Sequence, residues 1–128
     1  MPTNIPMKAT IKQFEKEHVE WEKILQDLNQ ENALLKYRLS EIVDDNEDHS
    51  FLQMAEYFQN ELLLKDETLK KLIKQRQELV AIMAKEQPLS QNMIVKQQEL
   101  RIKILRFEKK FVGLSREFNE KMVRVYKN

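Results

Sequence analysis

Glu15 and His18 are the residues whose types and spacing come closest to metal chemistry. A carboxylate and an imidazole three positions apart share one face of a helix, and this Glu-x-x-His pattern supplies ligands in di-iron helical bundles. Such a centre also needs a second Glu-x-x-His pair and two further glutamates. The only other histidine is His49, about 46 Å away along one continuous helix. We therefore predict no metal site and keep a metal-binding bundle centred on Glu15 and His18 as an alternative.

Few other residues could support catalysis. The chain has no cysteine, which excludes thiolate nucleophiles and thiolate metal sites. Its only glycine is Gly113, which excludes a glycine-rich phosphate-binding loop. No serine lies in a turn that would expose a nucleophile, and His18 would be the only credible general base. The sequence therefore predicts a protein that is not an enzyme, with no catalytic residue and no cofactor.

Charge is distributed unevenly along the chain, although the formal net charge is +1. Residues 1–50 carry a net −5, residues 51–95 carry net 0 and residues 96–128 carry net +6. The basic last segment is a candidate patch for binding an anionic membrane or nucleic-acid phosphates. The candidate residues are Lys103, Arg106, Lys109, Lys110 and Arg116. Four glutamates interrupt this segment and the acidic first segment can neutralise it, so we keep both binding functions as alternatives and expect neither partner.

The elements that position these residues are three helices. From Ile11 to Ile42, apolar side chains recur at alternating spacings of three and four, which is typical of a long helix packed against other helices. Two further stripes of the same kind follow. We expect a tail over residues 1–7 and a single domain over residues 8–128, with helices over residues 8–44, 50–86 and 88–126.

Turn residues separate the predicted helices. Ser50 and Gln53 have capping-box spacing, which predicts that Ser50 caps the second helix. Pro88 lacks an N–H and fits the first turn of the third helix. Because both turns are short, the sequence predicts an all-α, up-down-up antiparallel three-helix bundle with coiled-coil-like packing. The apolar faces are broad, so dimerisation into a larger bundle is an open alternative.

Polar residues interrupt the apolar stripes at two levels. Folding the helices back about the two turns brings His18 level with Arg76 or Gln77 and with Gln97, Gln98 or Glu99. It brings Asn32 level with Lys65 and with Lys109 or Lys110. The residues assigned to the layers are His18, Arg76, Gln97, Asn32 and Lys65. Single polar residues at such positions fix helix register and partner number. We predict two polar core layers with this structural role.

The predicted function is that of a scaffold or protein–protein interaction module, acting by self-association or by packing against a partner helix. The candidate interaction surface is an apolar stripe left uncovered by the bundle, with Phe51, Phe58, Phe107, Phe111 and Phe118 as its residues. The expected partner is a second copy, giving a homodimer, or another helical protein. No signal peptide or membrane span is visible, so we expect a cytoplasmic protein.

The stretch EHVEWEKILQDLNQENALLKYRLSEIV, over residues 17–43, resembles the first helix of short uncharacterised helical proteins from Bacteroidetes. The residues that carry the resemblance are His18, Trp21, Leu25, Glu31, Arg38 and Leu39. The resemblance implies a helical bundle and no activity, substrate or ligand, because the function of those proteins is unknown.

Overall fold

The computed structural model describes residues 7–45, 48–85 and 88–123, with the backbone alone over residues 7–10. Most of the predicted N-terminal tail and the last residues of the predicted third helix lie outside these ranges. The described residues form α1 (Met7–Asp44), α2 (His49–Lys85), α3 (Gln91–Phe118) and a π-helical turn, η1 (Asn119–Val123), and they contain no strand.

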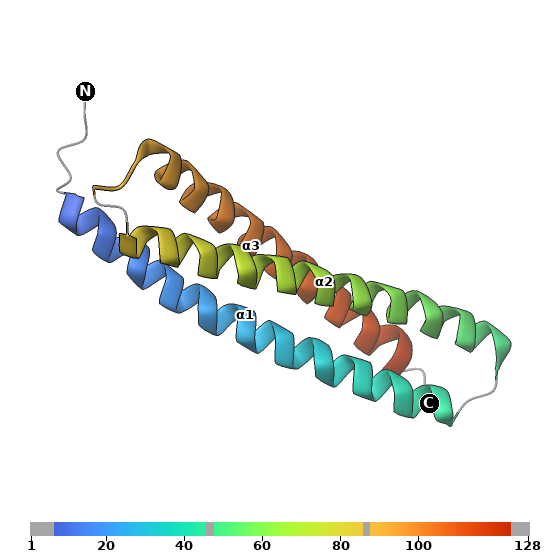
Figure 1. Cartoon of the computed structure of the whole chain (residues 1–128). Coiled ribbons are helices and arrows are strands. Elements are labelled where there is room, and N and C mark those ends of the chain that lie inside the picture. The colour runs from blue at the N-terminus through green and yellow to red at the C-terminus, as the bar shows by residue number, and fades with distance from the viewer. Residues whose placement is uncertain (1–6, 46–47, 86–87, 124–128) are drawn as a thin grey trace.

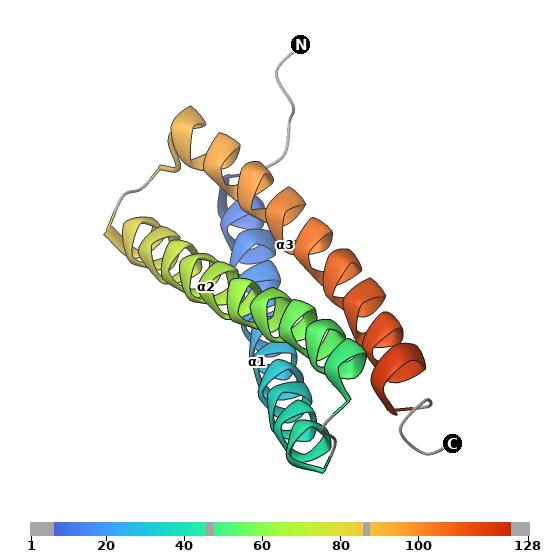
Figure 2. The same ribbon diagram turned by 90° about the vertical axis from the view of Figure 1, so that its right-hand side faces the viewer.

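The three helices run up, down and up (Figure 1). α1 and α2 lie side by side along most of their length, and α3 packs against both, more extensively against α2. A view at right angles shows that the helices enclose a common interior rather than forming a flat layer (Figure 2). The predicted all-α, antiparallel three-helix bundle is therefore confirmed.

The beginning of α2 corrects one capping prediction. Asp48 Oδ1 accepts a hydrogen bond from the backbone N–H of Phe51 at 3.2 Å, and the backbone oxygen of Asp48 accepts from Leu52 N–H at 2.9 Å. Asp48 therefore occupies the cap, and Ser50 lies in the first turn. Aspartate is a common cap residue because its side-chain oxygen satisfies an otherwise unpaired N–H of the first turn.

The beginning of α3 corrects a second prediction. Ser90 Oγ accepts from Met93 N–H at 3.2 Å, which makes Ser90 the N-cap and Gln91 the first helical residue. Pro88 precedes the cap and does not lie in the first helical turn. Leu89, just before the cap, is buried, so the chain enters α3 anchored on the core.

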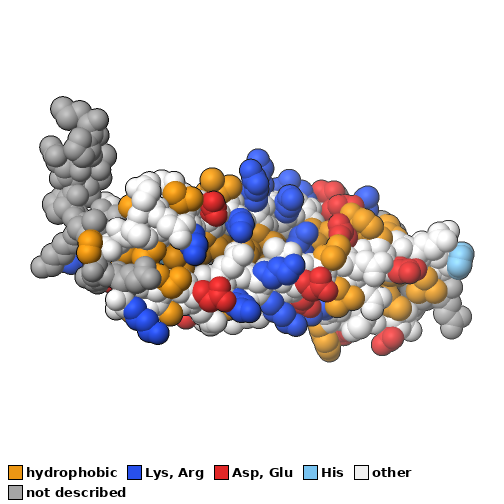
Figure 3. Space-filling model, turned by 45° about the horizontal axis from the view of Figure 1, so that its top comes forward, with side chains coloured by type: hydrophobic (Ala, Val, Ile, Leu, Met, Phe, Trp, Pro, Cys, Tyr) orange, Lys and Arg blue, Asp and Glu red, His pale blue; other side chains and the backbone are white. Residues whose placement is uncertain are grey.

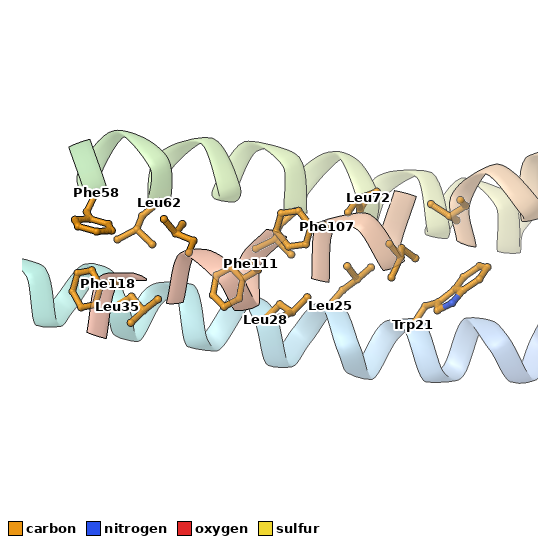
Figure 4. Packing of buried hydrophobic residues seen from close by; sticks show 14 of the residues in the cluster. Trp21, Leu25, Leu28, Leu35, Phe58, Leu62, Leu72, Phe107, Phe111 and Phe118 are labelled. Atoms are coloured by element: carbon orange, nitrogen blue, oxygen red, sulfur yellow. The ribbon is translucent and has the colours of Figure 1, made fainter. Parts of the chain in front are cut away.

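The core lies along the axis between the three helices, where the heptad positions of each helix point (Figure 4). Phe58 of α2 meets Phe118 of α3 edge to face, with ring centroids 5.4 Å apart. Phe107 and Phe111 stack along α3 with centroids 6.2 Å apart. Aromatic pairs in these arrangements contribute beyond their apolar area, so the Phe58–Phe118 pair helps to hold α3 against α2.

The five phenylalanines predicted as an interaction surface belong to this core, which corrects that prediction. All are buried, and the most exposed of them retains 8% of its surface. They are Phe51, Phe58, Phe107, Phe111 and Phe118. They are buried because three helices suffice to cover the stripe to which they belong.

Gly113 lies inside α3 on an exposed position, and a Cβ placed on it meets no atom of the described residues within 4 Å. The glycine therefore serves no close helix approach. We expect Gly113→Ala to stabilise the protein by about 1 kcal/mol, because alanine loses less backbone entropy than glycine on forming a helix. Urea denaturation checks this result, with Ser40→Ala on the exposed side of α1 as a control for a surface alanine. A loss of stability in Gly113→Ala would contradict the expectation.

Candidate functional site

A hydrogen-bonded chain of four side chains, two of them buried and two partly exposed, joins α1 to α3; we call it the His18 network. His18 Nε2 lies 2.7 Å from Gln97 Oε1, and Gln97 Nε2 donates to Glu17 Oε1 at 3.0 Å. Arg101 donates to both Glu17 oxygens, from Nε and Nη2, at 2.6 Å each. The structure thus brings together His18 and Gln97 and adds Glu17 and Arg101, which the sequence analysis did not assign to this layer.

The network fixes the protonation of His18. A carboxylate only accepts hydrogen bonds, so the Gln97 amide must point its nitrogen toward Glu17. Its oxygen then points toward the imidazole of His18. His18 Nε2 must therefore carry the hydrogen that it donates to Gln97 Oε1. The other ring nitrogen, Nδ1, is buried with no hydrogen-bond partner in the described part of the chain. A neutral imidazole with a deprotonated Nδ1 is the form that fits.

The surroundings favour that neutral form. Burial lowers the pKa of His18 from its ordinary value; the Gln97 bond and the Glu17 charge oppose this shift, and the charge of Arg76 adds to it. Trp21 packs edge-on against the imidazole, with ring centroids 4.8 Å apart.

Arg76 Nη2 of α2 lies 3.9 Å from Glu22 Oε1. The predicted His18, Arg76 and Gln97 therefore do lie at one level of the bundle.

Glu17 and Arg101 form the charged end of the network. The two bonds from Arg101 lower the pKa of Glu17 and outweigh the opposing effect of its burial. The same bonds raise the pKa of Arg101. Both groups are partly exposed, so the pair works mainly as a geometric clamp that aims Gln97 at His18.

The lowered pKa of His18 predicts a loss of stability in mild acid. In the unfolded chain His18 takes up a proton near pH 6.5, whereas the folded chain resists protonation. Stability is then complete above about pH 6.5 and falls as the pH drops toward the folded-state pKa. Thermal unfolding between pH 7.5 and 5.5 checks this, with His49→Gln as a control for the exposed histidine. The His18→Gln variant is expected to lose the dependence, and an unchanged dependence would contradict the assignment.

Metal binding has little support in the geometry. Glu15, the other half of the Glu-x-x-His pattern, is exposed, while His18 is buried. Glu17, and not Glu15, is the carboxylate linked to the imidazole through Gln97. Within residues 7–45, 48–85 and 88–123, no three or more His, Cys, Asp or Glu side chains gather as a metal site would require.

The second polar layer lies between α1 and α2. Asn32 is fully buried, and its Nδ2 donates to Leu62 O at 3.0 Å and to Asp66 Oδ1 at 2.7 Å. Lys36 binds the other oxygen of Asp66. The partner of Asn32 is therefore Asp66, one position beyond the predicted Lys65. Lys65 is half-buried and points instead into the groove between α2 and α3.

Three residues of the predicted basic patch line that groove. Lys103, Arg106 and Lys110 of α3 face two lysines of α2 across it, while Lys109 and Arg116 lie outside it. The cationic residues of this basic groove are Lys65, Lys71, Lys103, Arg106 and Lys110. Among the described residues, no carboxylate lines it. No described helix combines the length and apolar character that crossing a bilayer requires.

α3 carries a second apolar stripe that was not predicted from the sequence, and we call it the outer seam: Val95, Ile102, Leu105 and Val112. These side chains are 39, 49, 58 and 48% exposed. At about 100° per residue they lie on the side of α3 opposite its buried stripe. On the face shown in Figure 3, apolar side chains lie among and beside a cluster of Lys and Arg. The signal in the sequence was their own spacing of seven, three and seven.

No protein-family model, curated protein sequence or solved structure matches this chain. The resemblance of residues 17–43 to Bacteroidetes helical proteins stays a prediction from sequence. Function must therefore be argued from the two polar layers, the basic groove and the outer seam.

Proposed function

We propose that this protein is a non-enzymatic helical interaction module that acts by packing the outer seam of α3 against a further helix. The observation that carries the proposal is the exposure of four aliphatic side chains at heptad spacing on one helix face. A helix in a three-helix bundle needs one apolar face, and its opposite face is ordinarily polar. An aliphatic stripe on the solvent side is typical of a surface that another helix covers.

The rest of the molecule fits a rigid support for that surface. The His18 network fixes α3 against α1, and the Asn32 layer fixes α2 against α1. Both layers hold the rotation and height of their helices, because a shifted helix would leave buried polar groups unpaired. As part of the same proposal we place the module in the cytoplasm, since a chain without cysteine suits a reducing compartment.

A photo-reactive amino acid at position 105 tests the proposal in the cells that make the protein. Leu105 is the most exposed residue of the outer seam, and Tyr37 of α1, 62% exposed, provides a control position. The proposal expects a discrete cross-linked species from position 105 that disappears in the Ile102→Glu background. Position 37 is expected to give none. Absence of any species from position 105 would overturn the proposal.

A second candidate function is binding of an anionic membrane or nucleic acid through the basic groove. It is favoured by five cations from two helices around a groove whose described lining contains no carboxylate. Cosedimentation with vesicles containing phosphatidylserine, and titration of double-stranded DNA, test it. Binding should weaken steeply with salt and be lost in Lys103→Glu/Lys110→Glu but not in Lys12→Glu/Lys23→Glu on α1. Retention in the first double variant would exclude this candidate.

A further inference from the structure

We infer that the helix covering the outer seam is α3 of a second copy of this chain, paired antiparallel about a twofold axis between residues 103 and 104. The inference rests on the proposed function and names its partner. Three features support the inference. The order of apolar and polar residues in the outer seam matches itself in an antiparallel pair, and the charges beside the outer seam are complementary in that pair. Shifting one helix along the other removes the match between apolar residues.

The order of residues in the outer seam is self-complementary. With the two polar positions inside it, the stripe reads Val95, Gln98, Ile102, Leu105, Lys109 and Val112. In an antiparallel pair centred between residues 103 and 104, Ile102 faces Leu105 of the second copy. Val95 then faces Val112 of the second copy, and the Gln98 amide oxygen faces the Lys109 ammonium group. Every apolar residue meets an apolar residue, and each polar residue meets a hydrogen-bonding partner.

Neighbouring alignments lack this match. Sliding one helix by a heptad in one direction places Gln98 against Ile102 of the second copy. Sliding it in the other direction places Leu105 against Lys109 of the second copy. Each shift buries a polar group against an aliphatic one without a partner, which carries a desolvation cost. The sequence therefore selects one antiparallel register.

The charges beside the outer seam select the antiparallel direction. In this register Glu99 lies opposite Arg106 of the second copy, and Arg101 lies opposite Glu108 of the second copy. The twofold axis repeats both contacts, giving four pairs of opposite charge. A parallel pair would instead bring Arg101 against Arg106 of the second copy. Flanking charges of this kind determine orientation and partner choice in helix pairs.

In the monomer, the side chain of Arg101 is already fixed in position beside the outer seam. Arg101 uses Nε and Nη2 to bind Glu17, which leaves Nη1 for a carboxylate of a second copy. Its side chain is 38% exposed. The His18 network therefore also fixes the position of one of the flanking charges.

Disulfide trapping tests the direction and the register. The chain has no cysteine, so Val95→Cys and Val112→Cys each introduce a unique thiol. In the inferred dimer, position 95 lies opposite position 112 of the second copy, while the two copies of position 95 are offset by 17 residues, or about 25 Å. A disulfide requires Cα atoms within about 7 Å. An equimolar mixture of the two variants is expected to yield the mixed disulfide on oxidation, and each variant alone to yield none.

Light scattering over a concentration series tests whether the outer seam is the surface through which two copies associate. The wild type is expected to approach twice the 15.5 kDa monomer mass, and Leu105→Glu is expected to stay monomeric. Val19→Glu is the matched control: Val19 is also exposed and apolar but lies on α1. Glu99→Arg and Arg106→Glu should each raise the dimer dissociation constant about tenfold, and the combined variant should restore it because the exchanged charges still meet.

The outcomes separate this inference from the proposed function. A disulfide from Val95→Cys alone, or a dimer that survives in Leu105→Glu, overturns the antiparallel α3 pair. A monomeric wild type whose position 105 cross-links to a different protein overturns the inference and leaves the interaction module standing. A monomeric wild type with no cross-linked species overturns both.

Discussion

Phe58→Ala is expected to lower the free energy of unfolding by about 3–5 kcal/mol. Phe58 has no exposed surface, and its ring meets Phe118 across the α2 to α3 contact at 5.4 Å. Truncation removes the apolar area of the ring and leaves a cavity that neighbours such as Leu62 and Leu35 fill only partly (Figure 4). Single domains have a total stability of about 5–15 kcal/mol, so this loss consumes a large share of it.

Urea denaturation followed by circular dichroism measures this loss. Tyr37→Ala is a suitable control, because it also removes an aromatic ring from a helix but from an exposed position on α1. The control is expected to change stability by less than about 1 kcal/mol. A loss below about 1 kcal/mol in Phe58→Ala would mean that α3 does not pack on α2 through these rings.

Gln97→Leu is expected to lower the free energy of unfolding by about 1–3 kcal/mol, although it replaces a buried polar residue by an apolar one of similar size. Gln97 is fully buried and, among the described residues, is the one side chain that hydrogen-bonds to both His18 and Glu17. Without it, the imidazole N–H loses its acceptor in a place that water does not reach. The cost is that of an unpaired buried donor rather than of lost packing.

The double variant His18→Leu/Gln97→Leu distinguishes these two causes. It removes donor and acceptor together, so its stability should recover most of the loss seen in Gln97→Leu. Double-mutant analysis should then give a coupling of about 1 kcal/mol or more between the two positions. Strictly additive losses would contradict the pairing of His18 with Gln97.

Helix number, direction and approximate bounds follow from the spacing of apolar residues, because a long heptad stripe has few other ways to be buried. The same spacing and the short turns place His18 level with Gln97, at 2.7 Å in the structure. The helix starts were harder to predict. Asp48 and Ser50 are both good capping residues, and only the backbone path determines which one reaches the free N–H.

Two features of the candidate sites could not be read from heptad positions. Asn32 binds Asp66 rather than Lys65, because a side chain on the flank of α2 reaches into the layer from beside the stripe. The phenylalanines were predicted as an exposed surface because spacing shows which residues share a face but not whether that face is covered. Whether three helices suffice to cover it depends on their packing in three dimensions.

The two apolar faces of α3 have a consequence for folding. If α3 docked after rotating by half a turn, Ile102 and Leu105 would enter the core and the molecule would form a competing rotational isomer. That isomer would leave His18 and Glu17 without Gln97 and Arg101, which bind them in the native structure. The polar contacts thus discriminate between two ways of assembling the same helices. A chain with leucine at both position 18 and position 97 would keep most of its stability, but only the Glu17–Arg101 pair would still favour the native isomer, so the rotated isomer should become more populated.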